Sequence, residues 1–215
     1  QYCIYPENKV QSALVVGGTK QVNIDSIRNL KPDLIIAEKE ENTKEIVESL
    51  EKEFSVYVAE VQSIGDAYQM ISEMGKLTAR SMQADGWIDR IQTAFETIPR
   101  IKGKRAAYVI WKEPYMVAGN HTYIQTVLER MGFINAFAEL GGRYPVIDED
   151  DFQKAGLDYL FLASEPYPFT EKHKGEFTAL MPNVKTINVD GEMFWYGARM
   201  LEAAGYLRNL LKSIE

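Results

Sequence analysis

The chain has 215 residues, enough for one large hydrophobic core or two modest ones. Its composition, 46% hydrophobic and 26% charged, is typical of a globular protein. The net charge of −7 excludes a protein that binds nucleic-acid backbones, because such proteins need a basic surface. The longest apolar runs have only strand length, and the single cysteine, Cys3, excludes both an internal disulfide and a metal cage built from cysteines.

The first ten residues contain neither the basic segment nor the apolar segment of a signal peptide. They begin without an initiator Met and are typical of a strand end that enters a loop. We therefore expect the natural chain to start further upstream, so this segment does not indicate a compartment.

Apolar runs along the chain predict five buried strands with both faces covered, as in a parallel sheet. These runs are residues 33–37, 56–61, 106–111, 159–163 and 185–189. Helical periods at 41–54 and 123–131 alternate with them. Strands that alternate with helices indicate an α/β fold.

Apolar or small residues recur at steps of three and four from residue 64 to residue 98. This period predicts one rigid helix of about 50 Å, which Gly75 and Gly86 would bend. Such a helix is longer than an ordinary crossover between parallel strands, so we interpret it as a strut between two Rossmann-like lobes. The predicted domains are an α/β lobe at 1–62, the helix and its linker at 63–102, and a second α/β lobe at 103–215.

Two stretches of the chain have the same shape. Each contains a short helix that begins with an acidic residue and is followed by an apolar strand. The two stretches are NIDSIRNLKPDLIIA (23–37) and EDDFQKAGLDYLFLA (149–163). In each, an Asp stands eight residues before a second Asp that precedes the strand, namely Asp25 before Asp33 and Asp150 before Asp158. The repeat indicates two matched lobes and therefore a ligand cleft between them.

Ligands of α/β sheets bind beyond the carboxyl ends of the strands. Four loops follow these ends. The loop at 38–43 is polar, whereas the other three are rich in aromatic residues, at 111–122, 164–169 and 190–197. Aromatic loops suit a large, flat or partly apolar ligand. Candidate contacts in these loops are Trp111, Tyr115, Tyr167 and Trp195.

Enzyme motifs are absent from the sequence. It contains no phosphate-binding loop, dinucleotide fingerprint, nucleophile elbow or zinc-protease motif. His121 and His173 lack the spacing of a helical metal pair, so His121 is only a weak candidate metal ligand. We expect no covalent cofactor and no catalytic activity.

Three long segments resemble one family. They are similar to segments of the class III, helical-backbone substrate-binding proteins of ABC importers. The three segments are VGGTKQVNIDSIRNLKPDLIIA, YMVAGNHTYIQTVLERMGFINAF and GGRYPVIDEDDFQKAGLDYLFLA. These proteins carry cobalamin, ferric siderophores or haem, and they begin with a βα unit that this chain lacks. The resemblance implies a protein that captures a metal-bearing cofactor or chelate and delivers it to a membrane permease. It also implies a monomer, in the periplasm or anchored outside the cytoplasmic membrane.

The resemblance assigns roles where positions match. In the family, one carboxylate per lobe, at the head of the helix before a strand, docks into arginine pockets of the permease. The matching residues are Asp25 and Asp150, where the family usually has Glu. The alternative is that each Asp is only a helix N-cap or a first-turn acid. The implied ligand contacts are Met116, Tyr144, Trp195 and Tyr196 in the second lobe, and Thr19, Lys20 and Lys39 in the first.

Thr19 stands where cobalamin binders of the family place a Trp, and the two lysines would suit an anionic ferric complex.

The alternative function is an enzyme on the same scaffold, such as a chelatase or a nucleotide-sugar transferase. Its candidate groups are Glu113, His121, Glu165 and Glu192. A sensory domain that reuses the fold is a third possibility.

Overall fold

A computed structural model describes Cys3 and residues 5–214, and the chain forms two compact units, residues 1–60 and 61–215. Helices and strands alternate in both units, which confirms the predicted α/β class. The predicted cleft between the lobes stays a prediction.

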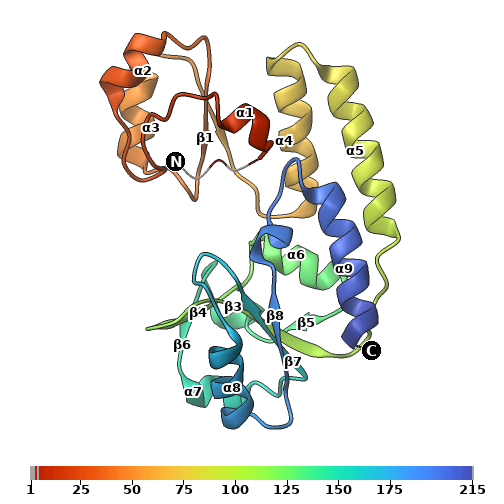
Figure 1. Cartoon of the computed structure of the whole chain (residues 1–215). Helices are drawn as coiled ribbons and strands as arrows, with labels where there is room; N and C mark the ends of the chain where they lie inside the picture. The colour runs from red at the N-terminus through yellow and green to blue at the C-terminus, as the bar shows by residue number, and fades with distance from the viewer. Residues whose placement is uncertain (1–2, 4, 215) are drawn as a thin grey trace. The chain divides into compact units, whose positions relative to one another are not determined.

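The first unit contains a small parallel sheet. Its elements are α1 (Glu7–Val10), α2 (Ile24–Leu30), β1 (Ile35–Glu38), α3 (Lys44–Glu51) and β2 (Val56–Ala59). β1 and β2 pair in parallel, with Ile35 opposite Val56 (Figure 1). Of the strand end and loop predicted for the first ten residues, Gln1, Tyr2 and Ile4 lie outside the described residues, and α1 occupies part of the predicted loop.

The second unit is built on a mixed sheet with the strand order β6-β4-β3-β7-β8, and β5 pairs with β3. Its strands are β3 (Arg105–Trp111), β4 (Tyr115–Val117), β5 (Ile134–Asn135), β6 (Val146–Ile147), β7 (Tyr159–Ala163) and β8 (Lys185–Val189). Its helices are α4 (Ile64–Leu77), α5 (Ser81–Glu96), α6 (Tyr123–Arg130), α7 (Glu149–Lys154), α8 (Glu171–Leu180) and α9 (Met200–Ile214), with 3-10 turns at Ala138–Leu140 and Gly191–Phe194. β3, β7 and β8 are parallel to one another, whereas β4 is antiparallel to β3 and β6.

Helices cover both faces of this sheet (Figure 1). Alternate residues of β3 and β7 point to opposite faces, so Tyr108 and Phe161 join the core beneath α5, α6 and α9. Val109 and Leu160 join a second core beneath α7 and α8. Because both of its faces are buried, β7 reads as a continuous apolar run, and both β7 and β8 have the predicted bounds.

The sequence repeat corresponds to a structural repeat. The order α2-β1-α3-β2 in the first unit matches α7-β7-α8-β8 in the second, and each pair of strands is parallel. Each leading helix is also followed by a left-handed residue, Lys31 (φ 49°) after α2 and Gly156 (φ 63°) after α7. A left-handed residue turns the chain sharply out of a helix and toward the strand.

The prediction of one continuous helix from 64 to 98 is wrong. Two helices, α4 and α5, pack against each other within the second unit. α4 ends in a left-handed turn, in which the Arg80 N–H donates to the Gly75 carbonyl and Ala79 has φ 55°. Gly75 does not bend a helix but allows close packing, because a Cβ there would lie 2.5 Å from the Ala84 Cβ. The break was missed because its left-handed position is occupied by Ala instead of the usual Gly.

Ala79→Gly should stabilise the protein by about 1 kcal/mol, because glycine adopts the left-handed conformation without the steric penalty of a Cβ. Urea unfolding at constant protein concentration measures the change. Ala179→Gly, at an exposed position of α8, is the matched control and should destabilise the protein by up to about 1 kcal/mol. A loss of stability in Ala79→Gly would contradict the proposed turn.

Candidate ligand-binding site

The carboxyl ends of three parallel strands lie at one edge of the sheet in the second unit. Trp111 is the last residue of β3, Glu165 lies in the loop after β7, and Asp190 follows β8. In α/β sheets this edge is where ligands bind. The candidate site is therefore built from the ends of β3, β7 and β8.

Two aromatic residues pair at this edge. The rings of Trp111 and Tyr167 lie edge to face with their centroids 5.6 Å apart. The Tyr167 N–H donates to the Ile110 carbonyl over 3.3 Å, which attaches the loop after β7 to the end of β3. Trp111 nevertheless remains 40% exposed. An exposed Trp held by its neighbours offers a preformed apolar surface to a ligand.

A second exposed indole, Trp195, packs edge to face against Tyr196 with ring centroids 5.7 Å apart. Trp195 is 37% exposed, and its interaction with Glu165 acts on the pKa of that carboxyl. Glu165 passes so close to Gly191 that a Cβ on that glycine would lie 2.6 Å from the Glu165 Cγ. Burial raises the pKa of the Glu165 carboxyl, and the hydrogen bond from Trp195 partly offsets that rise.

The remaining predicted contacts of this unit lie around the same strands. Tyr108 of β3 is buried against Phe194 with ring centroids 4.6 Å apart. Burial raises the Tyr108 pKa well above its ordinary value, and the neighbouring groups Glu165 and Tyr144 contribute to the rise. The half-buried Met116 of β4 pairs with Trp111, and Tyr196 packs edge to face against Tyr123 at 5.5 Å.

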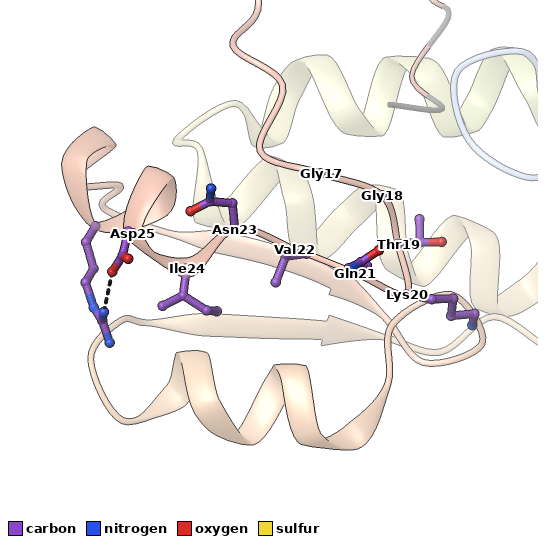
Figure 2. Close-up of a pocket in the computed structure, with 10 residues that line it drawn as sticks. Gly17, Gly18, Thr19, Lys20, Gln21, Val22, Asn23, Ile24 and Asp25 are labelled. Carbon is purple, nitrogen blue, oxygen red and sulfur yellow. Dashed lines mark hydrogen bonds and ion pairs between the residues drawn. The ribbon is translucent and has the colours of Figure 1, made fainter.

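In the first unit, the glycine-rich turn lines a hollow of about 830 Å³. Figure 2 shows the segment that forms it, with Lys20 toward one end and Asp25 toward the other. Gly17 has φ 129°, and a Cβ there would lie 2.4 Å from the Gln21 carbonyl oxygen, so the turn requires glycine. Asn42 fixes the turn by donating to the Thr19 carbonyl over 3.0 Å.

Both predicted lysines of the first unit already have partners. The Lys39 ammonium lies 2.7 Å from the Glu60 carboxylate, and the Lys20 ammonium donates to the Glu40 carbonyl. The Lys39–Glu60 pair is exposed and therefore weak, so an anionic ligand could replace it. The role of both lysines as ligand contacts stays a prediction.

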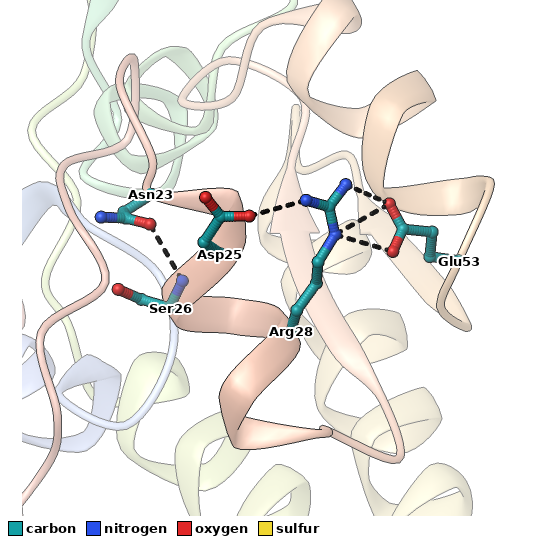
Figure 3. A network of polar contacts seen from close by, with 5 residues as sticks. All are labelled: Asn23, Asp25, Ser26, Arg28 and Glu53. Atoms are coloured by element: carbon teal, nitrogen blue, oxygen red, sulfur yellow. Dashed lines mark hydrogen bonds and ion pairs between the residues drawn. The ribbon is translucent and has the colours of Figure 1, made fainter.

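Asp25 and Asp150 occupy equivalent positions, and neither caps its helix. The cap of α2 is Asn23, which accepts from the Ser26 N–H over 2.9 Å (Figure 3). The cap of α7 is Asp148, which forms a capping box with Asp151. Both predicted docking acids stand in the first turn instead, with 83% and 72% of their side chains exposed. The interpretation as N-caps is therefore wrong, whereas the alternative that each Asp is a first-turn acid is confirmed.

Each of the two acids has a basic neighbour on its own helix. Asp25 lies 2.7 Å from Arg28, which also contacts Glu53 at 2.6 Å, so that Figure 3 shows Arg28 between two carboxylates. Hydrogen bonds to Glu53 first, and then to Asp25, raise the pKa of Arg28. Asp150 lies 3.2 Å from Lys154. Such exposed pairs are weak, so a partner's arginine can replace them.

Comparison with known proteins identifies the family. The sequence profile of a family described as periplasmic binding protein matches residues 2–182. The chain belongs to the periplasmic binding protein family. A search of curated proteins finds no significant match.

Solved structures of binding proteins share the fold. An ABC transporter substrate-binding protein from Listeria monocytogenes matches with a TM-score of 0.79 at 17% identity, over 96% of this chain and 86% of that one. The periplasmic haem-binding protein BhuT, solved with two haems, matches with a TM-score of 0.79 at 16% identity, over 98% and 86%. The vitamin B12-binding protein BtuF of Vibrio cholerae matches with a TM-score of 0.73 at 17% identity, over 97% and 85%. At these identities the matches show the fold alone.

Two predicted residues of this periplasmic binding protein lie apart from the strand-end aromatics. Tyr115 packs against Phe152 and Phe177 at 5.5 and 5.4 Å, beside a separate hollow of about 590 Å³. Its role as a ligand contact stays a prediction. His121 is exposed and left-handed (φ 56°). Among Cys3 and residues 5–214, no three His, Cys, Asp or Glu side chains gather to hold a metal ion.

The sequence interpretation missed the pairing of Glu165 with Trp195. Glu165 was considered only as a group for the enzyme alternative, and no local pattern links two residues 30 positions apart. The loops after adjacent parallel strands bring them together, since β7 and β8 are neighbours. The sequence signal for their proximity was the predicted parallel sheet, because the loops that follow two adjacent parallel strands lie close together.

Proposed function

We propose that this protein is the substrate-binding component of an ABC importer. It captures a metal-bearing cofactor or chelate in the periplasm, or anchored at the outer face of the membrane, and delivers it to a permease. The observation that carries this proposal is the pair of exposed indoles, Trp111 and Trp195, at the sheet edge of a periplasmic binding protein. No helix among the described residues is long and apolar enough to cross a membrane.

The ligand class follows from the size and chemistry of the site. Several large aromatic side chains on the ends of β3 and β8 suit a broad, partly apolar ligand. Matching solved structures are named for haem and vitamin B12 binding, which supports a corrinoid, haem or ferric siderophore as cargo. The proposed contacts are Trp111, Met116, Tyr144, Tyr167, Trp195 and Tyr196, with Thr19, Lys20 and Lys39 in the first unit.

Asp25 and Asp150 are the proposed permease contacts. Each is exposed, stands in the first turn of the helix that precedes a parallel strand, and is not the N-cap of that helix. A carboxylate in this situation can form charge-assisted hydrogen bonds with arginines of a membrane protein. The repeat therefore supplies one docking acid per unit.

Calorimetric titration tests the binding role. Purified protein should bind cyanocobalamin, haemin or a ferric hydroxamate with one ligand per monomer and a Kd of about 1 µM or tighter, which corresponds to about −8 kcal/mol. Native mass spectrometry of the same sample reports the stoichiometry and the monomeric state. The absence of binding to all three classes would contradict the proposed function.

A further inference from the structure

The second unit contains a hollow of about 590 Å³, and the described residues that line it include none of the strand-end aromatics Trp111, Tyr167 and Trp195. Three segments line this hollow, which we call the α7–α8 hollow. They are residues 112–115 after β3, residues 147–149 around the start of α7, and Glu176, Phe177 and Leu180 of α8. Its volume lies in the range of small-molecule sites, which is about 300 to 1,000 Å³.

Apolar side chains make up one part of this lining. The ring of Tyr115 packs against Phe152 and Phe177 with centroids 5.5 and 5.4 Å apart. Phe152 of α7 and Phe177 of α8 also pack against each other at 5.3 Å, on the face of the sheet that α7 and α8 cover (Figure 1). Because these rings hold Tyr115 in place while it stays half-buried, the hollow offers a preformed apolar surface to a ligand.

Several charged groups of the lining are already engaged within the protein. Lys112 is the only basic residue among the described residues of the lining, and its ammonium lies 2.5 Å from the Glu176 carboxylate. Only 16% of the Lys112 side chain is exposed. Asp148 caps α7, and its carboxylate accepts the Asp151 N–H over 2.9 Å. The cation of the lining is therefore neutralised by a lining acid, and it gives the hollow no surplus of positive charge.

Two carboxylates of the lining have no such partner. Glu113 and Glu149 are exposed, and in the described part of the chain neither forms an ion pair or a side-chain hydrogen bond. They come from two different segments, the turn after β3 and the first turn of α7. The lining thus combines unpaired negative charge with an apolar, aromatic surface. This combination recognises a cation on an apolar stem, because carboxylates and aromatic rings both attract a cation.

We propose that the α7–α8 hollow binds a small organic cation, namely an ammonium group on an aromatic or aliphatic stem. The stem packs on Tyr115 and Leu180, and the ammonium donates charge-assisted hydrogen bonds to Glu113 and Glu149. This site is separate from the proposed cargo site at the strand ends, and it gives Tyr115 a role outside that site.

Three related probes test the proposal. Phenethylammonium carries both groups, phenethyl alcohol keeps the stem without the charge, and methylammonium keeps the charge without the stem. NMR titration of isotope-labelled protein at pH 7.5 should give phenethylammonium a Kd at least about tenfold lower than that of either other probe, as a charged hydrogen bond or a buried ring provides. The amides that shift should lie within residues 112–115, 147–149 and 176–180.

Several results of this titration would contradict the proposal. These are equal affinity for phenethylammonium and phenethyl alcohol, equal affinity for phenethylammonium and methylammonium, shifts confined to other parts of the chain, and no binding of phenethylammonium at millimolar concentration.

Charge variants locate the ammonium. Glu113→Gln combined with Glu149→Gln removes both unpaired carboxylates and should remove the preference for phenethylammonium over phenethyl alcohol. Asp85→Asn combined with Asp89→Asn changes the net charge equally at two exposed positions of α5 and should keep the preference. Affinity for phenethyl alcohol should stay within about twofold in both variants, which reports that the hollow is intact. Loss of the preference in both variants, or loss of alcohol binding in the Gln variant, would contradict the proposed role of these acids.

A basic side chain of a partner protein is the alternative occupant, since Glu149 directly precedes Asp150. The peptide acetyl-Phe-Arg-Phe-amide tests it in the same titration. We expect this peptide to bind more weakly than phenethylammonium, because the hollow has the volume of a small-molecule site. Tighter binding of the peptide by about tenfold or more would overturn the small organic cation and assign the hollow to protein docking.

The outcomes also separate this inference from the proposed function. Binding of cyanocobalamin, haemin or a ferric hydroxamate without binding of phenethylammonium would overturn the inference alone. Binding of phenethylammonium without any of the three cargo classes would support the inference and overturn the proposed function.

Discussion

Replacing Asp25 and Asp150 together by Asn should reduce ligand uptake by at least about tenfold while the purified protein still binds its ligand. The change removes two exposed carboxylates but leaves both helix caps, Asn23 and Asp148, in place. Truncating one partner of a docked charge pair typically weakens an interface by about 2 kcal/mol or more. Uptake is measured in cells of the native host whose own copy of the gene is replaced by the variant.

Folding stability of this double variant should change little. The pairs with Arg28 and Lys154 are exposed, and such pairs contribute between about 0 and 1 kcal/mol. The matched control is Asn23→Ala, which should destabilise the protein by about 1 kcal/mol through loss of the cap and still support uptake. Normal uptake by the double Asn variant would show that these acids do not dock.

Removing both site indoles, Trp111→Ala with Trp195→Ala, should weaken ligand binding about 100-fold. Buried aromatic anchors commonly contribute about 2 kcal/mol or more each, and their effects are not fully additive. Both residues are more than one-third exposed in the described structure, so a bound ligand has substantial indole surface left to cover. Calorimetric titration of wild type and variant with the same ligand gives the ratio.

Trp87→Ala provides the control for the loss of an exposed indole. Trp87 is 41% exposed, close to the 40% of Trp111, but it lies on α5 with Arg90 over its ring. Its replacement should leave affinity unchanged within about twofold. Similar losses in the Trp87 and Trp111–Trp195 variants would indicate a nonspecific effect and contradict the location of the site.

Continuous apolar runs made most of the sheet predictable. β7 is buried on both faces and reads as a run of apolar residues with clear ends, whereas β8 carries Lys185, Thr186 and Asn188 among its five residues and is only partly buried. The two-residue strands β5 and β6 carry no such signal and depend on pairing with longer neighbours. Ala79 concealed the break between α4 and α5, because left-handed backbone at an Ala is uncommon and was not expected.

The location of the candidate site follows from the sequence, and it stays a prediction; its side-chain contacts follow from the sequence less well. Trp111, Tyr167 and Trp195 follow from the rule that loops at carboxyl strand ends bind ligands. The contacts that restrain Lys20 and Lys39 depend on tertiary structure and could not be inferred. The caps could have been found locally, since Asn23 and Asp148 are favoured cap residues two positions before the acids that attracted attention.

The most direct test of the binding role is visible absorption of the protein purified from its own host, combined with native mass spectrometry of the same sample. Corrinoid, haem and ferric chelates each absorb visible light, and each adds a distinct mass. Our account predicts one such chromophore per chain, with its mass released on denaturation. A colourless protein that carries no added mass, and that stays colourless after incubation with all three classes of ligand, would contradict the account.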